Sequence, residues 1–235
     1  MYYRISFPVG CATFVLLALP ASVIAEDDKK LARAKDFSEL SFHEFAKAFH
    51  NYASANEDMR LPHDITDRNG KPLLSWRVAI LPFLELPDLY NEFNRKEPWD
   101  SEHNKKLIER MPQIYAAPRG ADLKGQTCYQ SFAGTAALMN GKTVPIDAIP
   151  DGLKNTFMVV EAGEAVIWTK PADIPFDPKK PLPKLGGVYD GDFHVAFCDG
   201  DVCYIKKGVN EETLKKFITI AGNEKVRRKD LVPEK

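Results

Sequence analysis

Two short apolar runs separated by an Asp-Gly pair place the strongest constraint on how this chain of 235 residues can fold. In Phe193–Phe197 apolar side chains alternate along the run, and Val202–Ile205 resumes a composition rich in β-formers. Asp199-Gly200 stands between the runs, and Asp-Gly flanked by alternating apolar residues is a strong hairpin signal. The pattern predicts a β-hairpin whose apolar face must be covered by the rest of the chain.

Further β-rich runs occur upstream of this hairpin, at Thr127–Phe132, Phe157–Val160 and Ala165–Thr169. Glu161–Glu164 contains a glycine and predicts a turn between the last two runs. We therefore expect about five short strands in one antiparallel sheet. Residues 170–184 contain five prolines. That density excludes a central strand or a helix and predicts an extended crossing over the sheet.

Helical periodicity dominates the first half of the chain. Aromatic residues recur at helical spacing and predict an amphipathic helix over residues 38–54. They are Phe42, Phe45, Phe49 and Tyr52. Residues 73–86 are apolar on most sides, which predicts a buried helix that ends or kinks near Pro82. Arg77 is the only charge in that run before Glu85, so its head group should reach the surface or pair with an acid.

The C-terminal part should contain a last helix over residues 211–220, capped by Asn210 and stopped by Gly222. A charged tail follows at residues 223–235, and we expect it to be solvated and frayed. With the preceding elements, this predicts an α+β fold in which N-terminal helices pack on one antiparallel sheet that carries a terminal hairpin and a C-terminal helix.

Residues 1–25 have the form of a secretory signal peptide. Arg4 precedes an uncharged apolar stretch, and small residues precede a polar chain that begins at Glu26. The pattern predicts cleavage after Ala25 and export to the periplasm or beyond. The alternative is an uncleaved membrane anchor, because about 20 uncharged residues can span a bilayer. The remaining chain would comprise a charged leader at 26–37, a single α+β domain at 38–222 and the tail at 223–235.

The formal net charge of −1 argues against the strongly basic surface that nucleic-acid-binding proteins use. We therefore expect no nucleic-acid partner, and membrane contact only through an uncleaved N-terminal segment. The chain contains no phosphate-binding loop, dinucleotide fingerprint, zinc-protease motif or nucleophile elbow. No cofactor and no catalytic motif are predicted.

Three cysteines remain after the predicted cleavage: Cys128, Cys198 and Cys203. Exported proteins meet oxidising conditions, so one pair can close. A two-residue turn at Asp199-Gly200 would put Cys198 and Cys203 on one face of the hairpin as diagonal neighbours, about 7 Å apart and near the limit for a disulfide. A disulfide from Cys128 to one of them, or three reduced thiols, are the alternatives.

Two pairs of aspartates frame the hairpin and suggest a metal site, because hard cations prefer clustered oxygens. They are Asp190 with Asp192 and Asp199 with Asp201. A strand of six residues spans about 20 Å, which puts the pairs at opposite ends. Each pair alone offers fewer oxygens than the 6–8 that calcium takes.

Two other features suggest a ligand or a reaction. Glu161 and Glu164 flank the predicted turn, and paired carboxylates can act as general acid and base in a hydrolase. Trp168 begins the aromatic and proline-rich crossing, which could wall a pocket for a small solute or a glycan. We treat Trp168, Glu161 and Glu164 as candidate ligand-binding residues.

Three blocks of sequence carry a family resemblance. The first is Phe49–Tyr52 with Gly70–Val78 and Leu81–Glu85; the second is Glu97–Asn104; the third is Val159–Gly163 with Trp168–Pro171 and the hairpin residues Phe197, Asp199 and Gly200. Together they resemble a large bacterial family of uncharacterised exported proteins, catalogued as a domain of unknown function with a solute-binding-protein label. The resemblance extends over about residues 38–222.

Many members of that family begin with a pilin-like hydrophobic helix, whereas this chain has an ordinary secretion signal there. The resemblance implies a pilin-like α+β domain outside the cytoplasm and no established activity, ligand or catalytic residue. We therefore expect an exported, non-enzymatic envelope protein that acts through binding or assembly with an envelope protein or glycan. The alternatives are a soluble binder of a small solute or glycan and a hydrolase that uses Glu161 and Glu164.

Overall fold

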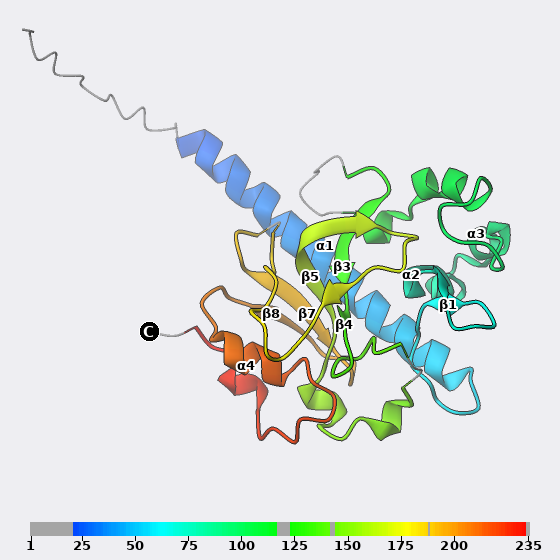
Figure 1. Ribbon diagram of the computed structural model, residues 1–235. Helices are drawn as coiled ribbons and strands as arrows, with labels where there is room; N and C mark the ends of the chain where they lie inside the picture. The colour runs from blue at the N-terminus through cyan, green and yellow to red at the C-terminus, as the bar shows by residue number, and fades with distance from the viewer. Residues whose placement is uncertain (1–20, 117–122, 142–143, 188, 234–235) are drawn as a thin grey trace, which may run out of the picture.

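The computed structural model describes residues 21–116, 123–141, 144–187 and 189–233 (Figure 1). Its mixture of helices and strands confirms the predicted α+β class.

The α-helices are α1 (Ala21–Ser54), α2 (Trp76–Ala79), α3 (Pro87–Glu92) and α4 (Glu211–Lys216). The strands are β1 (Ile65–Thr66), β2 (Pro72–Leu74), β3 (Gln126–Gln130), β4 (Phe132–Ala133), β5 (Phe157–Ile167), β6 (Ile174–Pro175), β7 (Phe193–Phe197) and β8 (Val202–Ile205). Short 3-10 helices are η1 (Leu81–Leu84), η2 (Asn104–Arg110), η3 (Gln113–Tyr115), η4 (Ile146–Ala148), η5 (Leu153–Asn155) and η6 (Arg228–Asp230).

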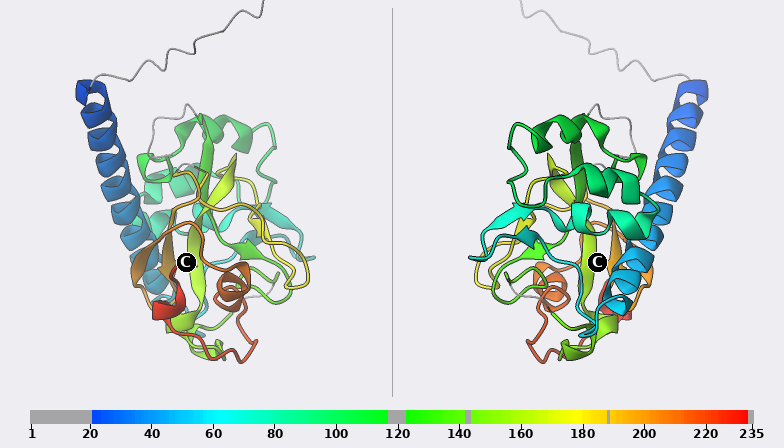
Figure 2. Two further views of the ribbon diagram at one scale, coloured as in Figure 1. Left: turned by 90° about the vertical axis from the view of Figure 1, so that its left-hand side faces the viewer. Right: turned by 90° about the vertical axis from the view of Figure 1, so that its right-hand side faces the viewer.

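Helix α1 begins at Ala21, well before the predicted start near residue 38. The predicted leader, residues 26–37, contains no Gly, Pro or β-branched residue and is rich in strong helix formers. An ion pair one turn apart, Lys30 with Glu26 at 3.2 Å, adds a small stabilisation. The leader is therefore the first part of one helix. That part extends beyond the rest of the domain (Figure 2), and Ala34 is the first of the described side chains along it to be buried.

Within the residues that the structure describes, no helix is long and apolar enough to cross a membrane. Most of the predicted signal peptide, residues 1–20, lies outside the described residues, so its form and its cleavage stay predictions.

The central sheet is antiparallel and has the strand order β3-β5-β7-β8. Strands β7 and β8 confirm the predicted hairpin, with Phe193 opposite Ile205 and Ala196 opposite Val202. Both faces of the sheet are covered. Along β7, Ala196 joins the core beneath α1, whereas Phe193 and Phe197 join a second core that contains residues of α4. This alternation follows from the period of two in a strand.

The predicted turn at Glu161–Glu164 is wrong, because β5 runs without interruption from Phe157 to Ile167. Gly163 allows two backbone segments to approach each other closely. Its N–H donates to the carbonyl oxygen of Lys184 at 2.7 Å, and a Cβ atom at this position would lie 2.4 Å from that oxygen. Two predicted strands are therefore one, and the main sheet has four strands where about five were expected.

The segment at residues 73–86 was predicted as one buried helix and instead forms β2, α2 and η1 in succession. Ser75 interrupts it in an extended conformation and caps α2, because its side chain accepts a hydrogen bond from the Arg77 N–H. Pro82 stands at the start of η1, where its missing N–H costs nothing. The helical path does break near Pro82, as predicted. The helix before the break is only α2, which ends at Ala79, so there is no long buried helix for Pro82 to kink.

The proline-rich crossing is extended, as predicted, and contains only the two-residue strand β6, which pairs in parallel with β4. The C-terminal helix α4 ends at Lys216, earlier than predicted, and is capped by Asn210 as predicted. The tail is not frayed in the part that is described. Arg228 forms ion pairs with Asp199 and Asp201, and Leu231 is buried.

Candidate functional site

The proline-rich crossing lines three pockets on the surface of the described residues. Its first part borders a pocket next to β1, its middle borders one beside β5, and its last part borders one beside α4. An extended segment with many prolines has few regular hydrogen-bonded partners, so it packs irregularly over its neighbours. This agrees with the expectation that the crossing could wall a pocket.

The pocket next to β1, here called the Asp64 pocket, has a volume of about 210 Å³. Apolar side chains and two carboxylates contribute to its lining. The apolar side chains are Pro72, Ala133, Met139 and Pro171, and the carboxylates are Asp64 and Asp173. Asp64 directly precedes β1, Pro72 begins β2 and Ala133 ends β4, so segments far apart in the sequence meet the crossing at this pocket.

Asp173 is held by a buried cation. Its Oδ1 atom accepts a hydrogen bond from Arg77 Nη2 at 2.8 Å and another from the Ser131 N–H at 2.8 Å, and the Trp76 indole N–H reaches both of its oxygens. The side chains of Arg77 and Asp173 are 0% and 2% exposed. Burial of a charge is tolerated when it is paired and hydrogen-bonded, so this pair confirms the expected acid partner of Arg77.

Asp64 lies beside this pair and is less well satisfied. Its Oδ1 atom accepts one hydrogen bond, from the Trp76 backbone N–H at 2.9 Å. Burial and the neighbouring Asp173 carboxylate raise the pKa of Asp64 to about 6, from an ordinary value of 3.8. A carboxyl group with a strongly raised pKa in a pocket is a recognised mark of a functional site.

His63 lines the same pocket. Its Nδ1 atom is buried and has no hydrogen-bond partner among the described residues. Burial lowers the pKa of His63 from its ordinary value, so the imidazole is neutral at pH 7. The pocket thus contains a carboxylate near its titration point and an unpartnered ring nitrogen, enclosed by apolar walls. Such a site can hold a small polar or charged solute.

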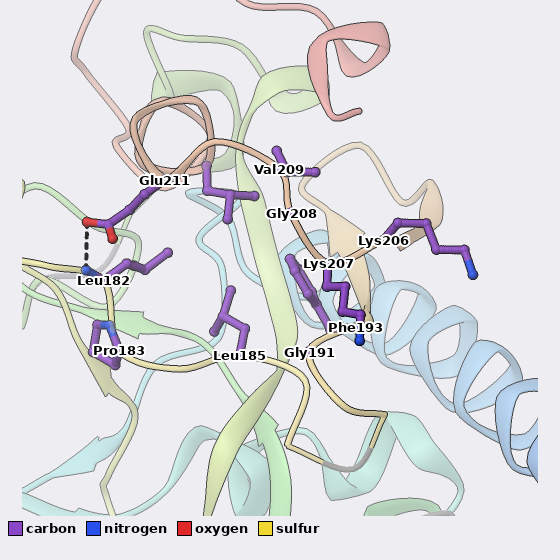
Figure 3. A pocket seen from close by; sticks show the side chains of 11 residues that line it. Leu182, Pro183, Leu185, Gly191, Phe193, Lys206, Lys207, Gly208, Val209 and Glu211 are labelled. Carbon is purple, nitrogen blue, oxygen red and sulfur yellow. Dashed lines mark hydrogen bonds between the residues drawn. The ribbon is translucent and has the colours of Figure 1, made fainter. Parts of the chain in front are cut away.

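The pocket beside α4 is shown in Figure 3 and is more open. Leu185, Phe193 and Leu214 contribute apolar surface, and the Leu182 N–H donates to Glu211 Oε1 at 2.9 Å across its edge. Its lysines, Lys206 and Lys207, are ion-paired with Asp192 and Asp190. Because its charges are already paired, this pocket is the weaker candidate.

Trp168 does not line an open pocket, so the prediction of Trp168 as a ligand-contacting residue is wrong. Its side chain is fully buried, its indole N–H donates to the Ile108 carbonyl at 3.0 Å, and its ring stacks on Tyr115 with centroids 5.7 Å apart. The large aromatic surface is better removed from water in the core, which leaves the following prolines to form the pocket wall.

Glu161 and Glu164 do not converge, so the predicted acid–base pair is wrong. Because β5 is continuous, residues three apart point to opposite faces. Glu161 is completely buried under α1, and Glu164 is exposed. Glu161 accepts hydrogen bonds from Ser38 at 2.6 Å and from the His194 N–H at 2.7 Å, and His194 Nδ1 lies 3.0 Å away. The network continues from Ser38 to Tyr129 and Tyr189, so it joins helix to sheet.

The four aspartates of the hairpin are engaged with cationic side chains. At one end Asp190 and Asp192 pair with Lys207 and Lys206, and at the other end Asp199 and Asp201 pair with Arg228. Among the described residues, no group of three or more His, Cys, Asp or Glu side chains could hold a metal ion. The predicted metal sites are therefore replaced by ion pairs, and the two pairs lie at opposite ends as expected.

The cysteines Cys128, Cys198 and Cys203 are all free. The hairpin places Cys203 opposite Val195, so the turn is one residue longer than the two-residue turn assumed from the sequence. A shift of one residue reverses the face of a side chain. Cys198 consequently joins the core under α1 and Cys203 contacts the other core, which rules out the predicted disulfide. Burial and nearby Glu161 raise the pKa of Cys128 to about 11, so its thiol is a weak nucleophile.

Asp64 and Asp173 were missed by the sequence analysis. One signal was available: Arg77, a lone charge in an apolar run, was expected either to reach the surface or to pair with an acid. Nothing local identified that acid, because an aspartate in a proline-rich loop and one near a turn are ordinary surface residues.

A family model described as SBP_bac_10, protein of unknown function (DUF1559), matches residues 39–140. Within these residues, which contain the first two blocks, the match confirms the resemblance to an uncharacterised family with a solute-binding label; the third block lies outside the match. The matched segment includes Asp64 and Arg77 and ends before Asp173. Comparisons with curated proteins and with solved structures found no match.

Proposed function

We propose that this chain is an exported, non-enzymatic protein that binds a small solute in the Asp64 pocket. The observation that carries the proposal is Asp64 itself, a partly desolvated carboxylate that lines a surface pocket and receives one hydrogen bond from the described residues. The solute-binding label of the matching family supports the same direction.

Binding is favoured over hydrolysis by the arrangement of the acids. Asp173 is occupied by Arg77, Ser131 and Trp76, so it is poorly suited to act as the second acid–base group that hydrolysis requires. The candidate glutamates are separated by the sheet. A pocket with one free carboxylate and apolar walls is suited to recognition.

Export is supported by the form of residues 1–25. The N-terminal end of α1 points away from the body of the domain, and β1 lies on the opposite side (Figure 1). A domain attached to the envelope or to a partner through this end of α1 would keep the Asp64 pocket accessible.

The test is thermal unfolding of the protein with a panel of sugars, amino acids, amines, small carboxylates and peptides. A ligand at a hundred times its dissociation constant adds about 2.7 kcal/mol, which raises Tm by about 5–10 °C for a domain of this size. Thr66 is exposed on β1 and lines the pocket, so Thr66→Trp should block it and abolish the shift.

Glu164→Trp is the matched control, because Glu164 is also an exposed strand residue and lines the neighbouring pocket beside β5. A shift that survives Thr66→Trp and disappears in Glu164→Trp would move the binding site to that pocket. A panel without any shift would contradict solute binding.

Assembly with an envelope protein is a second candidate function. It is favoured by the first part of α1, where Lys29 and Lys30 are exposed on a helix that extends beyond the domain (Figure 2). A photocrosslinker at Lys30 should capture a partner in the envelope, and one at exposed Lys179 on the crossing should not. Equal labelling from both positions would contradict assembly through α1.

A further inference from the structure

The solute-binding proposal leaves the chemical class of the ligand open, and the charges around the Asp64 pocket narrow it. We propose that the ligand carries a positive charge, as a primary amine or another small organic cation, and that Asp64 receives this charge. The inference rests on the proposed function, since it specifies what the same pocket binds.

Asp173 is already paired and hydrogen-bonded within the protein. This carboxylate is almost completely buried, pairs with Arg77 and accepts further hydrogen bonds from Ser131 and Trp76. Its charge is neutralised and its oxygens are occupied, so it has little capacity left for a ligand. Its electrostatic effect on its neighbour remains.

Arg77 is likewise held in place by its hydrogen bonds. All three of its guanidinium nitrogens are engaged: Nε with the Tyr129 carbonyl at 2.9 Å, Nη1 with the Ser75 hydroxyl at 2.7 Å, and Nη2 with Asp173. Arg77 therefore cannot turn towards Asp64 without breaking buried hydrogen bonds. With both aspartates ionised, these three side chains carry two negative charges and one positive charge.

The excess negative charge belongs to Asp64. Its Oδ1 atom accepts the Trp76 N–H, and the hydrogen bonds of the described residues leave Oδ2 for a ligand. None of the described residues that line the pocket is a lysine or an arginine. A cation entering the pocket would supply the missing charge, whereas an anion would meet the uncompensated carboxylate of Asp64.

The walls distinguish an organic cation from a metal ion. Calcium takes 6–8 oxygen ligands, and the pocket offers Asp64 with few further free oxygens. Met139, Pro72 and Pro171 instead present apolar surface that suits the carbon skeleton of an alkylammonium ion. The Nδ1 atom of His63 in the same lining is a second polar atom, and it has no hydrogen-bond partner among the described residues.

Proton binding should compete with the cation. Because the pKa of Asp64 is raised to about 6, the carboxylate is mostly ionised at pH 7.5 and mostly protonated at pH 5.0. A cation that needs the ionised form would bind about tenfold more weakly at pH 5.0. The same carboxylate would thus link ligand release to acidification.

The experiment is isothermal titration calorimetry of the exported form of the protein with defined probes. The cations are ethanolamine, 1,4-diaminobutane and tetramethylammonium; acetate, glucose and calcium chloride are the comparison probes. We expect at least one organic cation to bind at pH 7.5, with an affinity about tenfold lower at pH 5.0, and no measurable binding of acetate or glucose.

Two variants test whether Asp64 is the residue that binds the cation. Asp64→Asn keeps the shape of the side chain and an oxygen for the Trp76 N–H, and it should weaken cation binding at least tenfold. Asp147→Asn is the matched control, because Asp147 is exposed and does not line the pocket; its affinity should equal that of the wild type. The wild type should show the pH dependence and Asp64→Asn should lose it, which separates the effect of Asp64 from that of His63 in the same lining.

The outcomes separate this inference from the function on which it rests. Binding of glucose or acetate that Thr66→Trp abolishes would leave solute binding intact and overturn the cationic ligand. Binding of calcium alone would overturn it as well, and so would cation binding that Asp64→Asn leaves unchanged. Failure of every probe here and in the wider panel would overturn both.

Discussion

Two neighbouring carboxylates, Asp64 and Asp173, differ because their partners differ. Asp173 has a buried guanidinium and several donors, which stabilise its ionised form. Asp64 has one backbone donor, partial burial and the negative charge of Asp173, which together favour its neutral form. Of these two carboxylates, Asp64 has fewer partners, and both line the pocket.

This difference predicts a stability effect. The folded-state pKa of Asp64 lies above its unfolded value, so the folded protein binds the proton more tightly and loses stability as the pH rises from about 4 to about 6. Asp64→Asn cannot ionise and avoids that loss. At pH 7 the variant should unfold with a free energy up to about 3 kcal/mol higher than the wild type.

Urea denaturation at pH 4 and pH 7 measures the effect. The gain should be largest at pH 7 and should shrink towards pH 4, where Asp64 is protonated in the folded protein. If Asp64→Asn is less stable than the wild type at both pH values, the carboxylate stabilises the fold through its hydrogen bond from Trp76. That result would contradict the expectation that its ionisation destabilises the folded protein.

Helix α1 is fixed to the sheet by two kinds of contact. Its buried aromatic stripe, which includes Phe42 and Phe45, supplies most of the area that packing removes from water. The polar network from Ser38 to Glu161 and His194 then specifies which part of the helix meets which strand, because buried polar groups tolerate little displacement.

We therefore predict opposite outcomes for the two glutamates of β5. Glu161→Leu leaves the donors of Ser38 and His194 buried without their acceptor and should lower the free energy of unfolding by about 3–5 kcal/mol. Glu164→Leu changes an exposed side chain and should alter it by less than about 0.5 kcal/mol. Chemical denaturation followed by circular dichroism compares them; equal losses would contradict the assignment of the network.

At the scale of the whole molecule, the sheet separates two cores. One lies under α1, and the other is closed by α4, part of the crossing and the C-terminal residues around Leu231. The crossing passes along the edge of these layers, and its pockets arise there. The three described cysteines lie apart in these layers, and all three are free.

Thiol counting tests export and this distribution together. Cleavage after Ala25 would remove Cys11, so the exported protein should have the mass of a chain beginning at Glu26 and three reactive thiols when denatured without a reductant. Four thiols on a longer chain would indicate an uncleaved N-terminal segment. A single thiol on the shorter chain would indicate a disulfide and contradict the separation of the three cysteines.

Local patterns determined several elements correctly. The hairpin followed from its Asp-Gly turn, the α1 stripe from aromatic spacing, and the α4 cap from Asn210, because each depends on residues a few positions apart. The α+β class followed from the order of these patterns, and the family resemblance from short motifs spread along the chain. For the lone charge of Arg77 the sequence left two alternatives, the surface or an acid partner, and the structure shows the second.

Contacts between distant segments decided the features that the local patterns did not predict. Gly163 looked like a turn residue, but the passing Lys184 backbone makes it a point of close approach inside β5. One additional residue in the hairpin turn separated Cys198 from Cys203. The Asp64 pocket exists only because the crossing carries Asp173 to β1. A single sequence specifies turns and periodicities, whereas pKa shifts and pockets depend on which remote groups share a low-dielectric space, and packing alone sets that arrangement.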